Sequence, residues 1–442
     1  MKISKILIKT GLVLLAVLTV VLAVRAVFNY TEGRKLARAV AELKEQGIPI
    51  SAKDLTPPCP DEDNAARLWK AVENLLLIGG EDKGTLALAF TNFVAGKPLD
   101  PTHRDALAKM IVRNEMALQL MRKMGGKPCF LYRDPAAALT ETKIPDAVKM
   151  ILTTRLLGFE ALLMAEGGDV LGAVEKLRAA LEFSPRLAEE GFLITYLIAV
   201  ADTRTLLSFL SGVCGGRILA DATLVSLIDE IDPSAWRSRL GRSIAGERVA
   251  NLEWGSDLIQ GKARAMAGEK STDRLLYWLM RPILKAEVLW RLQKFSRWEQ
   301  MAADPYFRQR EILKTENKVL DHAPWYFKLS GYWEGGAYGT IFLKNAMLEA
   351  TFLVSRTGLA SRLYKSRMGK YPENLEALVP NILSEVPTDP FTGKPLVYRR
   401  EGEGFIVYRL GSNEKDDGGR STYMITQEVM DKDDDWAWRE SK

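Results

Sequence analysis

The chain has 442 residues, of which 47% are hydrophobic and 26% charged. This is the composition of an ordinary folded protein with room for two or three domains, and it excludes a largely disordered chain. The formal net charge of +5 is small for this length, and lysine and arginine are not clustered beyond the N-terminus. Composition therefore gives no support for a nucleic-acid partner.

The N-terminal segment has the pattern of a membrane signal. Three lysines precede an apolar run that is interrupted by Arg25; they are Lys2, Lys5 and Lys9. A bilayer needs about 20 apolar residues, and residues 6–28 reach that length if the charged side chains at either end extend to the interface. We predict that residues 1–28 form a single-pass signal anchor in the inner (cytoplasmic) membrane, with the bulk of the chain in the periplasm. A cleaved signal peptide is the alternative.

The middle of the chain is dominated by helical periodicity with short Gly and Pro breaks. Residues 29–63 are predicted to form a juxtamembrane helix and a Pro-rich linker, and residues 64–340 a domain of antiparallel helix pairs. One pair, at 156–185, has the spacing of a tetratricopeptide-like hairpin, with its turn at Gly168 and Pro185 ending the second helix. No second copy is evident, so we expect one such hairpin inside an irregular helical domain.

The cysteines are odd in number and do not form a disulfide framework. Cys59 and Cys129 both lie in Pro-containing loops, and an exported protein could join them. Three unpaired thiols are the alternative. Cys214 follows an apolar helix and is predicted to be a packing residue.

Recognisable catalytic motifs are missing from the sequence. The two histidines, His103 and His322, are too far apart in the chain to suggest a zinc site, and no Cys-x-x-Cys or Gly-x-Ser-x-Gly motif is present. Glu247 and Glu253 could share a helix face as a carboxylate pair, but charges on a solvated helix face are the simpler explanation. We therefore predict no catalytic residue.

The end of the chain has a different pattern. Residues 341–442 read as a long helix from Ile341 to Met368, Pro-rich turns, two short strands at 394–400 and 404–410, and an acidic Gly-rich loop. The short turn between the strands predicts a β-hairpin. The residues expected to face inward are Leu396, Tyr398, Phe405, Val407 and either Leu363 or Tyr364.

Three motifs in this region occur in a characteristic order: Gly369-Lys-Tyr-Pro372, Pro387-Thr-Asp-Pro-Phe-Thr-Gly-Lys-Pro395 and Asp435-Trp436. From about residue 362 onward the chain resembles the C-terminal domain of the major pseudopilin of type II secretion systems. The N-terminus has no prepilin motif, so assembly as a pilin subunit is not implied. The whole layout, with Pro60-x-x-Asp-Asn-Ala-Ala66, also resembles uncharacterised anchored envelope proteins of planctomycete-like bacteria, a likeness that implies no activity.

The pseudopilin resemblance also implies a cofactor. In that family the equivalent acidic loop holds a calcium ion, and the side chains at matching positions here are Asn413, Asp416 and Asp417. Carbonyl oxygens near Leu410 and Ser412 would complete an oxygen-rich shell of the kind that calcium prefers. The chain departs from the family by placing a lysine, at position 415, inside the loop, and an ordinary acidic turn is the alternative.

Together these patterns predict a mainly α protein with a transmembrane helix, an irregular helical-hairpin domain and a small α+β C-terminal domain. The predicted function is that of a non-catalytic, membrane-anchored structural or binding scaffold of the envelope, with an unidentified protein partner and an association with a secretion or pilus-like system. Two alternatives remain open. One is an extracytoplasmic hydrolase with an unrecognised carboxylate site, and the other is a receptor that binds a peptide or small ligand in a helical groove.

Overall fold

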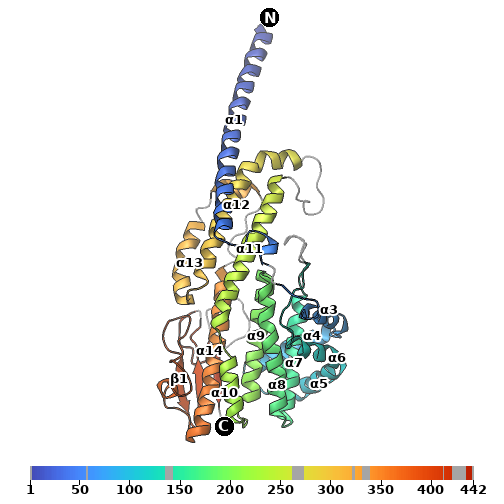
Figure 1. Ribbon diagram of the computed structural model, residues 1–442, viewed down its shortest axis with the longest axis vertical. Coiled ribbons are helices and arrows are strands. Elements are labelled where there is room, and N and C mark those ends of the chain that lie inside the picture. The colour runs from blue at the N-terminus through green and yellow to red at the C-terminus, as the bar shows by residue number, and fades with distance from the viewer. Residues whose placement is uncertain are drawn as a thin grey trace.

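The computed structural model describes residues 2–55, 58–134, 143–260, 273–320, 324–330, 339–411, 413–420 and 435–440. It is an elongated, mainly helical molecule from which one long helix projects (Figure 1). The α-helices are α1 (Lys2–Glu45), α2 (Ala52–Leu55), α3 (Ala65–Leu75), α4 (Gly80–Val94), α5 (Pro101–Arg113), α6 (Glu115–Met124), α7 (Ala147–Glu166), α8 (Val170–Leu187), α9 (Leu193–Cys214), α10 (Asp221–Glu230), α11 (Ser234–Gln260), α12 (Asp273–Met301), α13 (Tyr306–Leu320) and α14 (Gly339–Met368). Short 3-10 helices are η2 (Ala188–Glu190), η3 (Trp325–Ser330) and η4 (Leu375–Leu378), and the strands are β1 (Val397–Glu401), β2 (Gly404–Tyr408) and β3 (Ala437–Glu440).

Helix α1 confirms the predicted apolar N-terminal helix. Every residue from Ile8 to Val24 is exposed, and Arg25 is the first that the rest of the chain partly covers. The helix does not end where the anchor was predicted to end, at residue 28, but continues as one rod to Glu45 and packs along α12. A helix that exposes an uncharged, mostly apolar run from Thr10 to Val24 is suited to be a membrane anchor or a signal sequence.

The second long apolar helix, α9, is a core element. It is long and apolar enough to cross a membrane, yet 72% of its most apolar window is buried inside the protein. Helices α7 and α8 pack on it as an antiparallel pair (Figure 1). The close crossing of α7 and α9 depends on Gly158, because a Cβ atom there would lie 2.0 Å from the ring of Phe209.

The hairpin of α7 and α8 forms where it was predicted, with one correction. Gly168 adopts a φ of +98° at the turn, and the carboxylate of Asp169 accepts a hydrogen bond from the backbone N–H of Gly172 to cap α8. The prediction that Pro185 ends the second helix is wrong, since α8 continues to Leu187. The physical reason is that Phe183, Ser184 and Leu187 around the proline are buried in the core, so packing outweighs the one backbone hydrogen bond that proline cannot donate.

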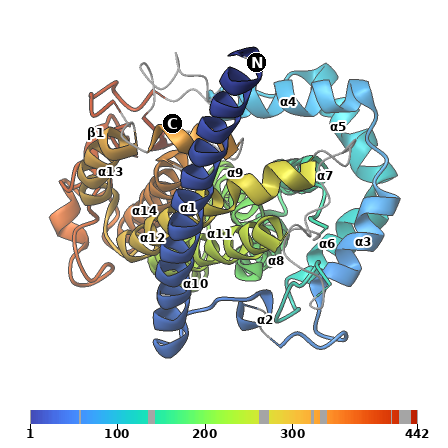
Figure 2. The same ribbon diagram turned by 90° about the horizontal axis from the view of Figure 1, so that it is seen from above.

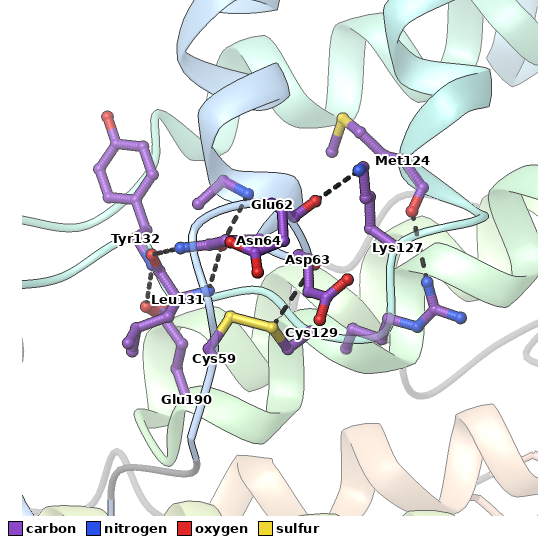
Figure 3. Close-up of a disulfide and its surroundings, with 12 residues drawn as sticks. Cys59, Glu62, Asp63, Asn64, Met124, Lys127, Cys129, Leu131, Tyr132 and Glu190 are labelled. Carbon is purple, nitrogen blue, oxygen red and sulfur yellow. Dashed lines mark hydrogen bonds between the residues drawn. A yellow bond between two sulfur atoms is a disulfide. The ribbon is translucent and has the colours of Figure 1, made fainter.

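A disulfide ties the start of α3 to the loop after α6. Cys59 and Cys129 are bonded, with Cα atoms 5.9 Å apart and a sequence separation of 70 (Figure 3). Beside them, the Asn64 side chain caps α3 and also exchanges hydrogen bonds with the backbone N–H and C=O of Leu131, each 2.9 Å long. The buried Glu190 carboxylate accepts the backbone N–H of Tyr132, and burial raises the pKa of Glu190 to about 7.

We expect the loss of this disulfide to destabilise the protein strongly. A crosslink closing a loop with a sequence separation of 70 restricts the unfolded chain by about 4 kcal/mol in the entropic model. The double variant Cys59→Ser/Cys129→Ser should therefore unfold at a lower denaturant concentration than wild type, and added reductant should lower the wild-type midpoint toward that of the variant. Reductant added to the double variant is the control and should have no effect. Alkylation of all three cysteines in the untreated, denatured protein would contradict the pairing.

The C-terminal part confirms the predicted hairpin. Strands β1 and β2 pair antiparallel, β3 pairs antiparallel with the other edge of β2, and the order is β1-β2-β3. Of the predicted inward residues, Leu396, Phe405, Val407 and Leu363 are buried, and Tyr398 and Tyr364 are partly buried.

The sheet packs on α14 through one close contact. Trp438 of β3 is fully buried, and a Cβ atom at Gly358 of α14 would lie 2.4 Å from its ring. All residues of β2 are buried, because α14 packs near one face and Gly419 of the acidic loop covers Ile406 and Tyr408 on the other. The acidic loop is therefore a structural layer of this small sheet.

Candidate functional site

The acidic loop is organised around Asp435, a residue that sequence analysis noted only as part of a motif. Its carboxylate is fully buried and accepts hydrogen bonds from the backbone N–H groups of Gly411 (3.1 Å), Asp417 (2.8 Å) and Gly419 (3.1 Å). Burial raises the pKa of Asp435 to about 6, and these hydrogen bonds oppose the rise. Asp435 thus holds both ends of the loop.

The structure brings two of the three predicted calcium ligands together. The amide of Asn413 donates to the carboxylate of Asp417 at 2.9 Å. The third, Asp416, accepts a hydrogen bond from the hydroxyl of Tyr408 on β2 at 2.8 Å. Across the described ranges, no group of three or more histidine, cysteine or acidic side chains converges closely enough to hold a metal ion. Ser412, whose carbonyl was expected to contribute, lies outside the described residues.

Two further charged residues of the acidic loop are Glu414 and Lys415. Lys415 is exposed, and in the described part of the chain its ammonium forms no ion pair with a carboxylate of the loop. The neighbouring Glu414 pairs instead with Arg310 of α13.

A buried pair behind the loop was not predicted from sequence. The carboxylate of Asp389, in the Pro-rich turn, accepts hydrogen bonds from the backbone N–H groups of Phe391 (2.8 Å) and Leu410 (3.0 Å). Burial raises the pKa of Asp389, and the nearby buried Arg409 guanidinium opposes that rise. Arg409 also lies 4.8 Å from the centroid of the Phe391 ring. The Pro-rich turn is therefore fastened to Arg409 and Leu410, the two residues that follow β2.

A cleft of about 960 Å³ lies between the helical body and the C-terminal sheet. Its apolar lining comes mainly from α4, the loop that follows α4, α7 and the residue before β3, and includes Phe93, Phe159, Leu162 and Trp436. The charged residues of the lining are Lys97, Glu166, Arg217, Arg420 and Arg439. Basic side chains outnumber acidic ones, so this cleft has a positive electrostatic bias.

Several of these charges already have partners in the protein. Arg217 donates to the carbonyl oxygens of Gly212 (2.7 Å) and Val213 (3.1 Å), which are left free at the end of α9. Arg439 pairs with Glu401 at 3.1 Å, and Glu166 pairs with Arg104. The arrangement suits binding of an anionic group more than proton transfer, for which a free acid or base is needed.

The other candidates from the sequence are not brought together where the structure describes them. His103 lies in the first turn of α5, 3.7 Å from the carboxylate of Asp100, and His322 lies outside the described residues. Glu247 and Glu253 are both half-buried on α11, where the carboxylate of Glu253 accepts the backbone N–H of Ala52 at 2.9 Å and so supports the start of α2. Cys214 is free and fully buried, as predicted.

No protein-family model, no curated protein and no solved structure matches this chain.

Proposed function

We propose that this chain is a membrane-anchored, extracytoplasmic binding protein that acts as a scaffold in the cell envelope. The observation that carries the proposal is α1, whose exposed apolar part runs directly into a part that packs on the folded body. Lysines at its N-terminal end favour a cytoplasmic N-terminus and a periplasmic body. The disulfide supports this placement, because disulfides persist in oxidising compartments.

Fractionation and protease accessibility test this placement together. The full chain should stay in the membrane pellet through a carbonate wash, and protease added to spheroplasts should digest its body. Recovery as a soluble protein that begins near Val27 would contradict the anchor and support a cleaved signal peptide. Digestion only after lysis would contradict the periplasmic orientation.

A binding role is supported by the cleft between the helical body and the sheet. Its apolar lining and basic rim suit an anionic peptide or a small amphipathic ligand, which favours the receptor alternative over a carboxylate-dependent hydrolase. Association with a secretion or pilus-like system is part of the proposal and depends on the C-terminal resemblance alone. A photoreactive residue at Lys97 should crosslink a periplasmic partner in cells, whereas one at Lys83, on α4 outside the cleft lining, should not.

Calcium binding by the acidic loop is a second proposal. If an ion joins Asn413, Asp416 and Asp417, millimolar calcium should raise the melting temperature of the protein above its value in chelator. The stabilisation expected is about 2.7 kcal/mol when free calcium exceeds its dissociation constant a hundredfold. Asp417→Asn should abolish the difference, and magnesium should substitute poorly, because it demands a tighter octahedral shell.

Glu414→Gln is the matched control for this experiment. It removes one negative charge from the same loop, but the carboxylate of Glu414 pairs with Arg310 and does not face Asp417. The control should keep the full calcium response. Equal melting temperatures of wild type in calcium and in chelator would show instead that the backbone hydrogen bonds to Asp435 hold the loop without a metal.

A further inference from the structure

Basic, aromatic and apolar side chains meet at the surface where α1 joins the folded body. Arg25 is the first half-buried residue of α1, and its guanidinium carbon lies 3.5 Å from the centroid of the Trp278 ring on α12. The same guanidinium donates a hydrogen bond to the backbone carbonyl of Trp278. Since Arg25 is the first charged residue after the apolar run and the first that the folded body partly covers, this level is where an inserted helix would leave the hydrocarbon of the bilayer.

Three cations gather at this level. Lys285 of α12 donates from its ammonium to the backbone carbonyl of Asn29 at 3.2 Å, one turn beyond Arg25. Burial lowers the pKa of Lys285, and the positive charges of Arg281 and Arg25 lower it further, which places all three within electrostatic range. Over the ranges that the structure describes, none of the three pairs with a carboxylate, and the Nε groups of both arginines are buried without a hydrogen-bond partner.

Exposed apolar and aromatic side chains surround these cations. Figures 1 and 2 show the first turns of α12 running sideways toward α1 before the helix turns to follow it, and α12 contains Pro282, a residue type that bends helices. Leu275 and Leu279, on these first turns, are 63% and 45% exposed. On η3, Trp325 is 72% exposed, and the adjacent tyrosine at 326 packs edge-on against Phe28 of α1.

We propose that Arg25, Arg281 and Lys285 bind the phosphate of an anionic phospholipid, with the first turns of α12 lying in the interfacial layer of the same membrane that α1 enters. A phosphate among the three cations would relieve their mutual repulsion and accept hydrogen bonds from both arginines. Exposed leucines beside a tryptophan are the pattern of a helix lying in a membrane interface, and tryptophan and tyrosine prefer the headgroup level. The inference rests on the proposed membrane anchor and adds a specific lipid class to it.

The test uses the full chain in an uncharged maltoside detergent. It is titrated with dihexanoyl phosphatidylglycerol, with dihexanoyl phosphatidylcholine and with glycerol 3-phosphate, and the melting temperature is recorded. Phosphatidylglycerol should raise the melting temperature at concentrations at which the other two do not. The double variant Arg281→Gln/Lys285→Gln should require about ten times more phosphatidylglycerol or more for the same rise, because each cation near a lipid surface contributes about 1 kcal/mol.

Controls separate the lipid site from general effects of charge and from the anchor. Lys314→Gln removes an exposed lysine of α13, away from the cluster, and should keep the wild-type response. Lys285→Gln alone is the milder variant if the double variant does not fold. Equal responses to both lipids, or a double variant that responds as wild type, would overturn the site, and an equal response to glycerol 3-phosphate would assign it to free phosphate esters. If the double variant stays in carbonate-washed membranes, the proposed membrane anchor is supported independently of the result for the lipid site.

Discussion

Gly246→Ala should destabilise the protein by about 3 kcal/mol or more, the largest effect that we expect from a single methyl group. A Cβ atom at Gly246 of α11 would lie 1.5 Å from the backbone carbonyl oxygen of Gly191. That oxygen belongs to a residue with φ of +79°, which closes the turn between η2 and α9. Backbone atoms cannot rotate away as a side chain does, so α11 and the turn must separate.

Gly241→Ala, five residues earlier on the same helix, is the matched control. The nearest atom to a Cβ there is 3.8 Å away, an ordinary van der Waals distance. Because alanine is favoured over glycine inside helices, the control should be neutral or more stable by about 0.5–1 kcal/mol. Chemical denaturation of the three proteins in detergent measures the difference. Equal stability of the two variants would show that α11 does not cross Gly191 at this distance.

Asp202→Asn should make the protein more stable at pH 8 and leave its stability at pH 4 nearly unchanged. Asp202 is fully buried on α9, and neither of its carboxyl oxygens has a hydrogen-bond partner among the described residues. Burial raises its pKa to about 8, with nearby Thr154 and Arg155 opposing the rise. The folded protein therefore keeps the proton of Asp202 at neutral pH.

The sign of the pH dependence follows from this shift. An aspartate in the unfolded chain loses its proton near a pKa of about 3.9, so between about pH 4 and pH 8 the folded state binds more protons than the unfolded state. The contribution of Asp202 to the free energy of unfolding is therefore largest below about pH 4 and is lost as the pH rises toward 8. The two pKa values differ by about four units, and each unit is worth about 1.4 kcal/mol, which places the effect of the asparagine variant at pH 8 at about 5 kcal/mol.

Unfolding free energies of wild type and Asp202→Asn at pH 5, 6.5 and 8 measure this effect. The difference between the two proteins should widen steadily with pH. Other buried carboxyl groups with raised pKa values, such as Glu190, are present in both proteins and cancel in the difference. A constant difference across the range would contradict a protonated Asp202 in the folded protein.

The sequence predicted those features that depend on local patterns. Hydrophobic periodicity located α1, α7, α8 and α14, and alternation with a short turn located the hairpin of β1 and β2. The cap that Asn64 forms on α3 is a local feature of this kind, because its side chain acts on the next residues of the chain. Its second role, clamping Leu131, joins segments 67 residues apart and has no local signature.

Long-range packing decided the features that sequence analysis missed. Helix α5 ends at Arg113 and α6 begins at Glu115, and the break between them is made by Asn114, whose side-chain amide bonds the backbone of Leu77, 37 residues earlier in the chain. The importance of Asp435 to the acidic loop depends on three backbone N–H groups that approach it only after folding. The cation cluster beside α1 joins residues 256 positions apart, as in the bond from Lys285 to Asn29.

The uninterrupted course of α1 has a mechanical consequence. From Arg25 to Glu45 the helix continues beyond the proposed bilayer surface for about 30 Å, at 1.5 Å per residue, with no turn that could act as a joint. The body is therefore oriented by the tilt of its own anchor, and it cannot swivel to search the space around it as a domain on a flexible tether does. The C-terminal sheet lies at the opposite end of the molecule from the N-terminus (Figure 1). It is therefore held at a fixed height above the proposed membrane surface and in a fixed orientation to it. Under the proposed function, a partner that uses the cleft beside this sheet would have to reach that height, so position as well as charge would restrict which partners bind.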